Sequence, residues 1–361
     1  MKKKDDLEHL RKKIDQINEE ILDLLNKRAS VVLEVGRVKK KAKSDYHVLD
    51  REHKIYQQLA KINKGPFPSS AIRPVFREII SASLSLEHEL RVAYLGPEAT
   101  FCHIAAIQQF GQSATFVQSR SLRDVFNMVE RGEADYGVVP IENTTEGVVN
   151  PTLDMFIESQ LKISAEILLG VSHHLLSKNG KLKGIKEIYS HSQAIAQCSY
   201  WLEQNVPDIP VLEIFSTAKA AESAAKNPKI AAIAGEFAAK FYGLKPIFTH
   251  IEDNPKNFTR FWVIGKKSPG RTGEDKTSVM LSVKDGVGAL HNTLKPFARH
   301  KINLAKIESR PFRPRPWEYL FFIDLEGHTN DKNVSRALDE VKDTAQFLKI
   351  LGSYPKSESK T

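Results

Sequence analysis

The sequence predicts a chain of several domains: an all-helical first part, an α/β central part and a small α+β module at the end. Three observations predict this. The chain has 361 residues, more than one typical domain. Residues 1–64 contain no proline and one glycine, Gly36, as long helices require. From Arg91 onward, short apolar runs alternate with helical stretches, which is typical of α/β folds.

Composition predicts a cytosolic globular protein. Hydrophobic residues are 41% and charged residues 27% of the chain. No apolar run is long enough to span a membrane, and the basic N-terminal tip lacks the apolar stretch of a secretory signal. The two cysteines, Cys102 and Cys198, form neither a disulfide framework nor a metal-ligand cluster, and the histidines lack zinc-type spacing. We therefore expect no metal.

The net charge of +9 is partly concentrated near the N-terminus, where residues 1–43 hold thirteen Lys or Arg and eight Asp or Glu. Such an excess can attract nucleic acid or small polyanions. Because the acidic residues are interleaved and no aromatic-rich basic patch accompanies them, the pattern favours a solvated helix face over a nucleic-acid surface.

The first helix carries a heptad seam with a single polar member, Arg28. Its members, at alternating steps of three and four, are Leu7, Leu10, Ile14, Ile17, Ile21, Leu24, Arg28, Val31, Val35 and Val38. A guanidinium facing a helical core is costly unless an anion meets it. That anion could be a nearby glutamate or a bound ligand.

Arg11 and Lys39 lie one step after seam positions, at the same edge of this helix. They are 28 residues apart, roughly 42 Å along a straight helix, so they cannot touch one small ligand within a chain. Two such helices packed antiparallel would bring Arg11 of one chain near Arg28 and Lys39 of the other. The pattern predicts a homodimer, or a higher homo-oligomer, with two composite cationic pockets.

A later helix repeats this signature. Its seam is Ile72, Phe76, Ile79, Ser83, Leu86 and Leu90, with Ser83 as the polar exception. Glu87 follows one turn later on the same side, and Arg51 and Glu52 begin the helix in between. A pocket of these residues suits a small dicarboxylate with an ether or hydroxyl oxygen.

At these positions residues 1–90 resemble the all-helical chorismate mutases, which are intertwined dimers. The resemblance implies that Arg11 and Arg28 hold the two carboxylates of chorismate. Lys39 and Glu87 would flank the ether oxygen, where negative charge develops as the bond breaks. Glu52 would accept a hydrogen bond from the ring hydroxyl. Arg51 and Ser83 match further positions of the family's site. Some members have aspartate where this chain has Val48, and if that contact is made by the backbone N–H, Val48 can still supply it.

The central region reads as strands separated by helices, in a mainly parallel sheet. The predicted strands are 91–96, 135–141, 162–169, 187–190, 229–234 and 260–264, and the clearest helices are 121–131, 193–204 and 217–226. Polar clusters at residues 94–101, 140–150 and 189–198 follow strands, and N-F-T-R-F (257–261) opens the last one. Each cluster alone is typical of helix capping. Together they suggest a ligand cleft at the sheet's edge, and no nucleotide-binding glycine motif accompanies them.

These four clusters, in this order, resemble prephenate dehydratase over residues 91–267. The resemblance implies two subdomains with a cleft, like periplasmic binding proteins, and loss of the ring hydroxyl and ring carboxylate of prephenate without a cofactor. Thr259 would assist the leaving hydroxyl. Arg260 would pair a substrate carboxylate or be structural. The other implied pocket residues are Thr100, Asn143, Ser190, His191, Ser192, Gln193 and Gln197.

Beyond a linker at 266–276, residues 277–355 read strand, helix, strand, strand, helix, strand, a ferredoxin-like order. D-G-V-G-A-L-H (285–291) and N-L-A-K-I-E-S-R-P (303–311) resemble the ACT domain of prephenate dehydratases, which implies phenylalanine as an effector bound between paired domains. The alternative is a module that only dimerises. The matching residues are Gly288, Ala289, Leu290, Asn303, Leu304, Glu308, Ser309, Arg310 and Pro311.

The chain as a whole resembles the bifunctional chorismate mutase/prephenate dehydratases of phenylalanine biosynthesis. The expected domains are 1–90, 91–267 and 277–355. Two other interpretations stay open on the sequence. One is a cytosolic solute-binding or sensor protein built from the cleft and the ACT module. The other is an active dehydratase whose helical domain only regulates.

Overall fold

The computed structural model describes residues 2–42, 49–284, 286–312 and 318–357. The chain divides into two compact units, one formed by residues 1–90 with 110–115 and the other by the rest. No helix in these described ranges is both long and apolar enough to cross a membrane. Each unit is described by itself.

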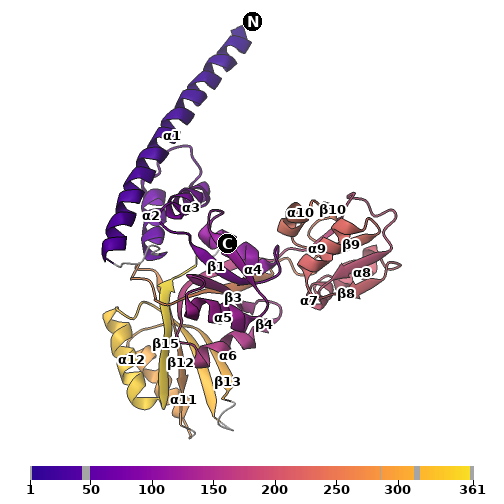
Figure 1. The fold of residues 1–361 in the computed structure, drawn as a ribbon. Helices are drawn as coiled ribbons and strands as arrows, with labels where there is room; N and C mark the ends of the chain where they lie inside the picture. The colour runs from indigo at the N-terminus through magenta and orange to yellow at the C-terminus, as the bar shows by residue number, and fades with distance from the viewer. Residues whose placement is uncertain (1, 43–48, 285, 313–317, 358–361) are drawn as a thin grey trace. The chain divides into compact units, whose positions relative to one another are not determined.

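Within residues 2–42 and 49–90, the first unit forms three helices, as predicted (Figure 1). They are α1 (Lys2–Ala42), α2 (Leu49–Ile62) and α3 (Ser69–Ser85). Pro68 precedes α3 in an extended conformation, which ends the turn predicted at 65–70. Val48 lies outside the described residues, so its predicted role stays a prediction.

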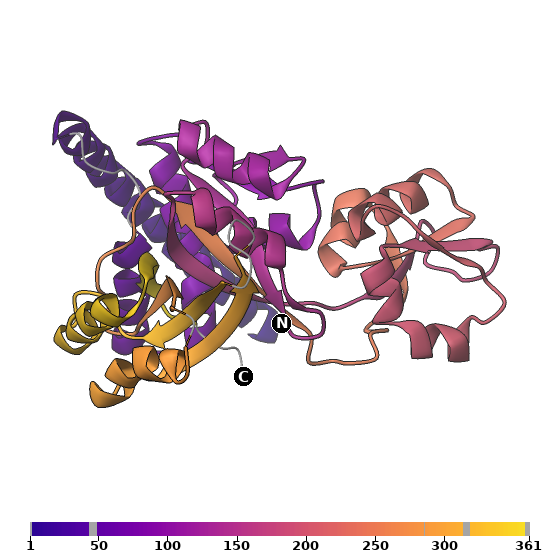
Figure 2. The same ribbon diagram turned by 90° about the horizontal axis from the view of Figure 1, so that it is seen from below.

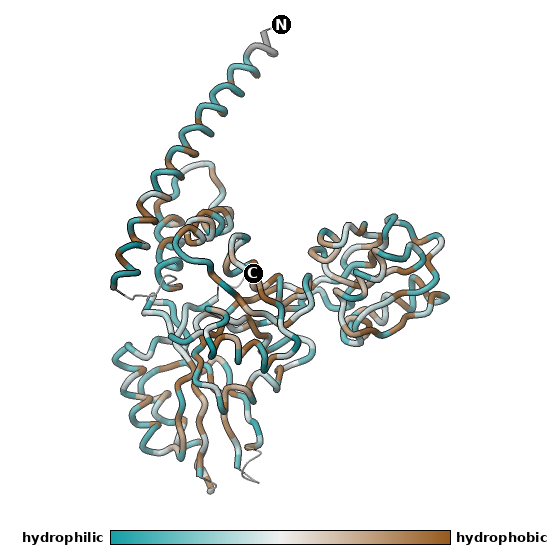
Figure 3. Tube along the Cα trace, in the orientation of Figure 1, coloured by the Kyte–Doolittle hydropathy of each residue, from teal (hydrophilic) through white to brown (hydrophobic). Residues whose placement is uncertain are grey.

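The apolar seam of α1 faces solvent in the isolated chain. Apolar residues recur along the helix in Figure 3, and every apolar member of the predicted seam is exposed, from 41% for Val35 to 66% for Val38. Exposed apolar stripes of this length mark interaction surfaces. The exposure agrees with the predicted pairing of two copies.

The second unit begins with a first lobe, a sheet of strand order β2-β1-β3-β11-β5 with β4 beside β3. β1 is parallel to β3, whereas β11 is antiparallel to both β3 and β5, so the prediction of a mainly parallel sheet is wrong here. The elements are β1 (Arg91–Leu95), α4 (Phe101–Phe110), β2 (Thr115–Ser119), α5 (Leu122–Arg131), β3 (Tyr136–Asn143), β4 (Gly147–Val148), α6 (Asn150–Glu158), β5 (Lys162–Gly170) and β11 (Phe258–Gly265).

A second lobe is formed by a mixed sheet of order β10-β6-β9-β7-β8. The chain enters it after β5 and returns before β11, so two segments join the lobes (Figure 2). Its elements are β6 (His174–Ser177), β7 (Glu187–Ser190), α7 (Ser192–Ala196), α8 (Ser199–Asn205), β8 (Val211–Glu213), α9 (Thr217–Lys226), β9 (Ile230–Ala234), α10 (Glu236–Tyr242) and β10 (Lys245–Phe248). Two sheets instead of one match the predicted pair of subdomains.

The apolar run of β9 is continuous because helices cover both faces of this sheet. Ala232 and Ala234 pack in a cluster with the alanines of α9, whereas Ala231 and Ile233 pack with Cys198 and Leu202 on the other face. Because side chains alternate along a strand, successive residues of β9 pack into two different hydrophobic cores, one on each face of the sheet.

The third sheet has the order β13-β14-β12-β15 and the predicted ferredoxin-like connections. Its elements are β12 (Asp275–Ser282), α11 (Ala289–Arg299), β13 (Leu304–Pro311), β14 (Tyr319–Glu326), α12 (Lys332–Thr344) and β15 (Phe347–Pro355). The two helices cover one face (Figure 1), where Val279 and Ile323 are buried. From the other face, Met280, Phe322 and Leu351 enter the hydrophobic core of the first lobe.

Gly352 makes this shared core possible. A Cβ at this position of β15 would lie 2.2 Å from the backbone oxygen of Ile163 in β5. We expect Gly352→Ala to lower the free energy of unfolding of the second unit by about 3 kcal/mol, because neither backbone can yield. Denaturant unfolding measures the change. The control is Gly170→Ala, whose Cβ would meet Phe258 at an ordinary 3.7 Å. Equal stability of the two variants would contradict the close packing.

Candidate active sites

The polar exceptions of the two helical seams meet each other. Arg28 of α1 donates a hydrogen bond through Nη1 to Ser83 Oγ of α3. The Ser83 hydroxyl in turn donates to the backbone oxygen of Ile79, 2.7 Å away. The guanidinium therefore has a neutral hydroxyl as partner and keeps its charge available for an anion.

Lys39 of α1 forms a second pair with Glu87, which lies two residues beyond the end of α3. Lys39 Nζ lies 3.4 Å from Glu87 Oε2, and the Glu87 side chain is 3% exposed. Gly36 leaves room for this side chain, because a Cβ there would lie 3.1 Å from Glu87 Cγ. The lone glycine of the first 64 residues thus has a packing reason.

α2 contributes the remaining acidic residue at this end of the helical unit. Glu52 is buried, whereas Arg51 is exposed. The Tyr56 hydroxyl, one turn later, hydrogen-bonds to Glu52, and burial followed by this carboxylate raises the pKa of Tyr56. Arg11 is exposed and lies seventeen residues before Arg28 on the same helix. Within one chain, the structure brings together Arg28, Lys39, Ser83 and Glu87 but leaves Arg11 apart.

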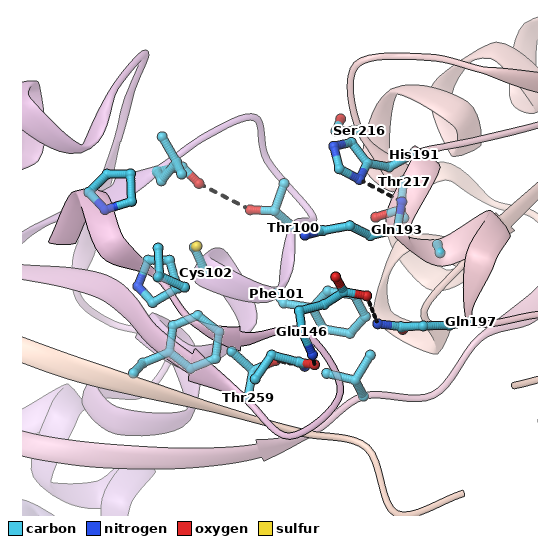
Figure 4. A pocket seen from close by; sticks show the side chains of 18 of the residues that line it. Thr100, Phe101, Cys102, Glu146, His191, Gln193, Gln197, Ser216, Thr217 and Thr259 are labelled. Carbon is cyan, nitrogen blue, oxygen red and sulfur yellow. Dashed lines mark hydrogen bonds between the residues drawn. The ribbon is translucent and has the colours of Figure 1, made fainter. Parts of the chain in front are cut away.

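A cleft of about 620 Å³ lies between the two lobes of the second unit (Figure 4). Thr100, Asn143 and Thr259 line it from the first lobe, and His191, Gln193 and Gln197 line it from the second. Six of the predicted residues therefore share one cavity. The Thr100 hydroxyl donates to the backbone oxygens of Leu95 (3.2 Å) and Pro97 (3.0 Å), so it shapes the loop.

The orientation of the Asn143 amide is determined by backbone donors. Its Oδ1 accepts from the N–H groups of Thr145 (2.9 Å) and Glu146 (3.1 Å). Its Nδ2 therefore faces the other way and donates to Thr259 Oγ1 (2.9 Å) and Asn257 Oδ1 (2.8 Å). Thr259 accepts this bond, and no described residue accepts its hydroxyl hydrogen, so that hydrogen is free to be donated.

The amide side chains of Asn143, Asn257 and Gln197 form a chain of hydrogen bonds in which each amide nitrogen donates to the next residue. Asn257 Nδ2 donates to Gln197 Oε1 (2.8 Å), and Gln197 Nε2 donates to Glu146 Oε1 (3.3 Å). Because Gln197 Oε1 is an acceptor, His173 Nε2, 2.9 Å away, must carry hydrogen and donate to it. Burial lowers the pKa of His173, which keeps the ring neutral. Gln197 thus ties the second lobe to both connecting segments and to the first lobe.

Two predicted pocket residues lie away from the cleft lining. Ser190 is fully buried and donates to the backbone oxygen of Ile233 at 2.8 Å, because the end of β7 is inside the second sheet. Ser192 begins α7 and is absent from the lining residues, whereas its neighbours His191 and Gln193 are present. Ser190 therefore has a structural partner inside the sheet, whereas Ser192 is exposed beside two lining residues without being one of them.

Arg260 is a further correction, because its guanidinium leaves the cleft. It donates to Glu166 (2.8 Å) and Asp324 (2.6 Å), with Tyr354 Oη 3.1 Å away. Neighbouring residues of a strand point to opposite faces, so Thr259 in the cleft places Arg260 against the third sheet. Of the two interpretations of Arg260, the structural one holds.

The cleft also has residues that the sequence analysis did not single out. Glu146 lies inside the motif at 140–150 and lines the cleft. Asn257, from the motif at 257–261, is not a lining residue but hydrogen-bonds to the lining residues Asn143 and Gln197. His173 and Phe215 had no such signal, and Phe215 is 78% exposed where it lines the cleft. Cys102 lines the cleft too, but burial raises the pKa of its thiol to about 12, which makes it a poor nucleophile.

In the third sheet, the two predicted effector motifs occupy different places. Gly288 has φ +73° and caps α11, which Ala289 and Leu290 begin. Asn303 lines a polar cavity of about 690 Å³ whose lining includes none of these three residues. Leu304 starts β13 beside it.

Farther along β13, side chains alternate between faces, so Glu308 and Arg310 point one way and Ser309 the other. The structure corrects the prediction for Arg310: its Nη2 donates to both carboxylate oxygens of Asp154 in α6, at 2.7 and 2.9 Å. Its charge is therefore used within the protein.

Comparisons with known proteins agree with this geometry. Family models match in order: chorismate mutase type II over residues 10–88, prephenate dehydratase over 92–269 and the ACT domain over 277–343. A bifunctional chorismate mutase/prephenate dehydratase from Aquifex aeolicus is 50% identical, covering 98% of this chain and 99% of its own. Another from Stutzerimonas stutzeri is 42% identical, covering 99% and 100%. The crystal structure of prephenate dehydratase from Arthrobacter aurescens in complex with L-Phe has a TM-score of 0.68 and 35% identity, covering 74% of this chain and 90% of that chain.

Proposed function

Because this chain belongs to the bifunctional chorismate mutase/prephenate dehydratases, it rearranges chorismate to prephenate and converts prephenate to phenylpyruvate, and we propose which residues perform each step. We assign the mutase to residues 1–90, the dehydratase to 91–267 and the ACT domain to 277–355. The protein acts in the cytoplasm as a homodimer or higher homo-oligomer and needs no cofactor.

In the mutase, cationic side chains from two copies hold one chorismate. Arg28 of one copy and Arg11 of the other bind the two carboxylates, while Lys39 and Glu87 flank the ether oxygen. The 3.4 Å Lys39–Glu87 pair and the Arg28–Ser83 bond support this assignment, because they hold three of the groups around one point. Donors already in place stabilise the charge that develops in the transition state. Arg51 and Glu52 complete the pocket, and Glu52 accepts from the ring hydroxyl.

In the dehydratase, the carboxylate leaves the ring as carbon dioxide, and its bonding electrons complete the aromatic ring. The bond to the ring hydroxyl breaks at the same time, so negative charge develops on the departing oxygen. Thr259 donates a hydrogen bond, through its free hydroxyl hydrogen, to that oxygen as it leaves as hydroxide. The observation that carries this assignment is the fixed direction of the Asn143 amide, which leaves that hydrogen unused. Thr100, His191, Gln193 and Gln197 line the rest of the prephenate site.

Asn143→Asp tests the direction of this hydrogen bond. An aspartate can still accept from the two backbone N–H groups, but it cannot donate to Thr259, whose hydroxyl would then donate to the carboxylate. We expect dehydratase kcat to fall by about a hundredfold. Steady-state kinetics with prephenate measures the loss.

Asn257→Asp is the matched control, because it adds the same charge to the same amide chain. Asn257 Oδ1 already accepts from Asn143, so the bond from Asn143 to Thr259 survives the change. We expect a clearly smaller loss of kcat. Equal losses in the two variants would show that added charge, and not hydrogen-bond direction, decides the rate.

The whole proposal is tested by incubating the pure protein with chorismate and following prephenate and phenylpyruvate by chromatography. Both products should form in sequence. Phenylpyruvate from prephenate but none from chorismate would mean that the helical unit only regulates. Neither product would favour a solute-binding or sensor protein.

We further propose that phenylalanine binds the ACT domain and inhibits the dehydratase. The relative from Arthrobacter aurescens was crystallised with L-Phe, and this chain has the glycine-capped α11 at Gly288. Because the cavity that Asn303 lines does not include Gly288, the phenylalanine site would combine Gly288, Ala289 and Leu290 of one copy with Asn303 and Leu304 of another. Glu308 and Ser309 lie farther along the same strand.

A further inference from the structure

The proposed catalytic residue Thr259 and its partner Asn143 form a cross-strand pair between β11 and β3, and a second cross-strand pair lies next to it. In the register of β11 and β3, Thr259 lies opposite Asn143, and Arg260 lies opposite Glu142. Successive residues of a strand point to opposite faces. Thr259 and Asn143 therefore face the cleft, and Arg260 and Glu142 face the third sheet one residue away.

The third sheet holds Arg260 in a buried, charge-balanced cluster. Asp324 of β14 accepts from its Nη1 at 2.6 Å, and Glu166 of β5 lies 2.8 Å from its Nη2. Lys276 of β12 binds the same Glu166 at 2.8 Å. The side chains of Arg260, Glu166 and Asp324 are 10%, 2% and 6% exposed. Removing one charge from such a cluster leaves another without compensation, so the cluster resists displacement of either sheet.

Glu142 is held by the strand that carries part of the proposed effector site. Lys306 Nζ of β13 lies 2.7 Å from Glu142 Oε2, and Arg260 Nη1 lies 4.0 Å from the same oxygen. Lys306 lies two residues after Leu304 and two before Glu308. This pair is less buried than the Arg260 cluster, with side chains 19% and 35% exposed. Breaking or moving the Lys306–Glu142 ion pair therefore costs less free energy than breaking the Arg260 cluster.

The same face of β13 holds a second element of the cleft. Arg310, two residues after Glu308 and therefore on the same face, binds both carboxylate oxygens of Asp154 in α6. The first residues of α6, Asn150 and Pro151, line the cleft. Two cationic residues of β13 thus contact elements of the cleft. Lys306 binds β3 at the residue before Asn143, and Arg310 binds α6 close to the end that lines the cleft.

We infer that Glu142 and Arg260 are positioning residues for Asn143 and Thr259, and that Lys306 and Asp324 of the ACT domain set their placement. The inference rests on the proposed roles of Asn143 and Thr259. A shift of β13 moves Glu142, and through the shared backbone it moves Asn143, whose amide holds the Thr259 hydroxyl. Phenylalanine bound at β13 would reach the reaction by this route, since coupling requires contacts that differ between two states.

Lys306→Met in the full chain tests the inference, because methionine keeps the length of the side chain and removes its charge. We expect dehydratase kcat to fall roughly three- to tenfold with KM within about twofold, since misplacement of a reacting group acts on turnover. Inhibition by phenylalanine should weaken, while phenylalanine binding measured by calorimetry should persist. Lys306→Arg should keep the wild-type kcat and inhibition.

Arg299→Met is the matched control. It breaks another ion pair of the ACT domain, the 2.6 Å contact between Arg299 and Glu340, which touches neither β3 nor β11. This variant should match the wild type in kcat and in inhibition. The charge swap Lys306→Glu with Glu142→Lys should recover most of the turnover that Lys306→Met loses.

The outcomes separate this inference from the function on which it rests. If the wild type converts prephenate while Lys306→Met keeps the same kcat and the same inhibition, the inference is wrong and the dehydratase assignment stands. If the charge swap restores nothing, the pair is structural only. If the wild type does not convert prephenate, the assignment itself fails.

Discussion

Thr259→Val should lower dehydratase turnover by about a hundredfold to a thousandfold and leave mutase turnover unchanged. Valine keeps the shape and the strand preference of threonine, so β11 should form normally. It cannot donate to the departing oxygen, and it leaves Asn143 Nδ2 without its 2.9 Å acceptor. Removing one donor to a developing oxyanion typically has an effect of this size. Separate assays with prephenate and with chorismate measure the two activities.

Thr259→Ser supplies the comparison, since serine keeps the hydroxyl and loses a methyl group. It should retain turnover within about tenfold of the wild type. If Thr259→Val matched Thr259→Ser, the hydroxyl would have no role in the step. Loss of mutase activity together with dehydratase activity would indicate misfolding instead.

Mixing two inactive mutases should restore activity. Arg11→Ala and Arg28→Met should each lower mutase turnover by about a hundredfold or more, because a chorismate carboxylate loses its guanidinium. If each site takes Arg11 from one copy and Arg28 from the other, a heterodimer of the two variants has one intact site and one doubly defective site. The purified heterodimer should then show about half the wild-type turnover, and a random mixture about a quarter.

Two affinity tags allow isolation of the heterodimer, and the dehydratase of each variant provides the folding control. Its cleft lies in the second unit and contains neither arginine, so dehydratase turnover should stay at the wild-type level. A heterodimer without recovered mutase activity would contradict the shared site. A wild type that is a monomer in solution would contradict it too, because the apolar seam of α1 would then have no partner.

Much of the fold follows from local pattern. The seam of α1, the strand–helix alternation after Arg91 and the six elements of the third sheet were all predictable, since each depends on hydrophobic period and on turn residues. The directions of the strands in the first sheet were not. β11 returns from the second lobe to lie antiparallel between β3 and β5, a pairing between residues far apart in the chain.

The candidate sites were predictable where polar residues interrupt an apolar pattern. Arg28 and Ser83 broke their seams and proved to contact each other. Thr259 and Asn143 stood in motifs at strand ends and proved to be paired. His173 could not be predicted from its local sequence, because its role depends on a hydrogen bond to Gln197, which belongs to the second lobe.

By itself the sequence determined the order of elements, the polar exceptions on their faces and the family to which the chain is similar. Only the tertiary structure decided what each polar residue meets. Thr259 and Arg260 are neighbours in β11 whose side chains point to opposite faces of the sheet. The local sequence does not indicate which of these faces meets a ligand and which meets another sheet. That choice depends on the third sheet, which covers Arg260 with Asp324 and leaves Thr259 to the cleft. The physical reason is that burial and charge pairing are properties of packed surfaces, which distant segments create together.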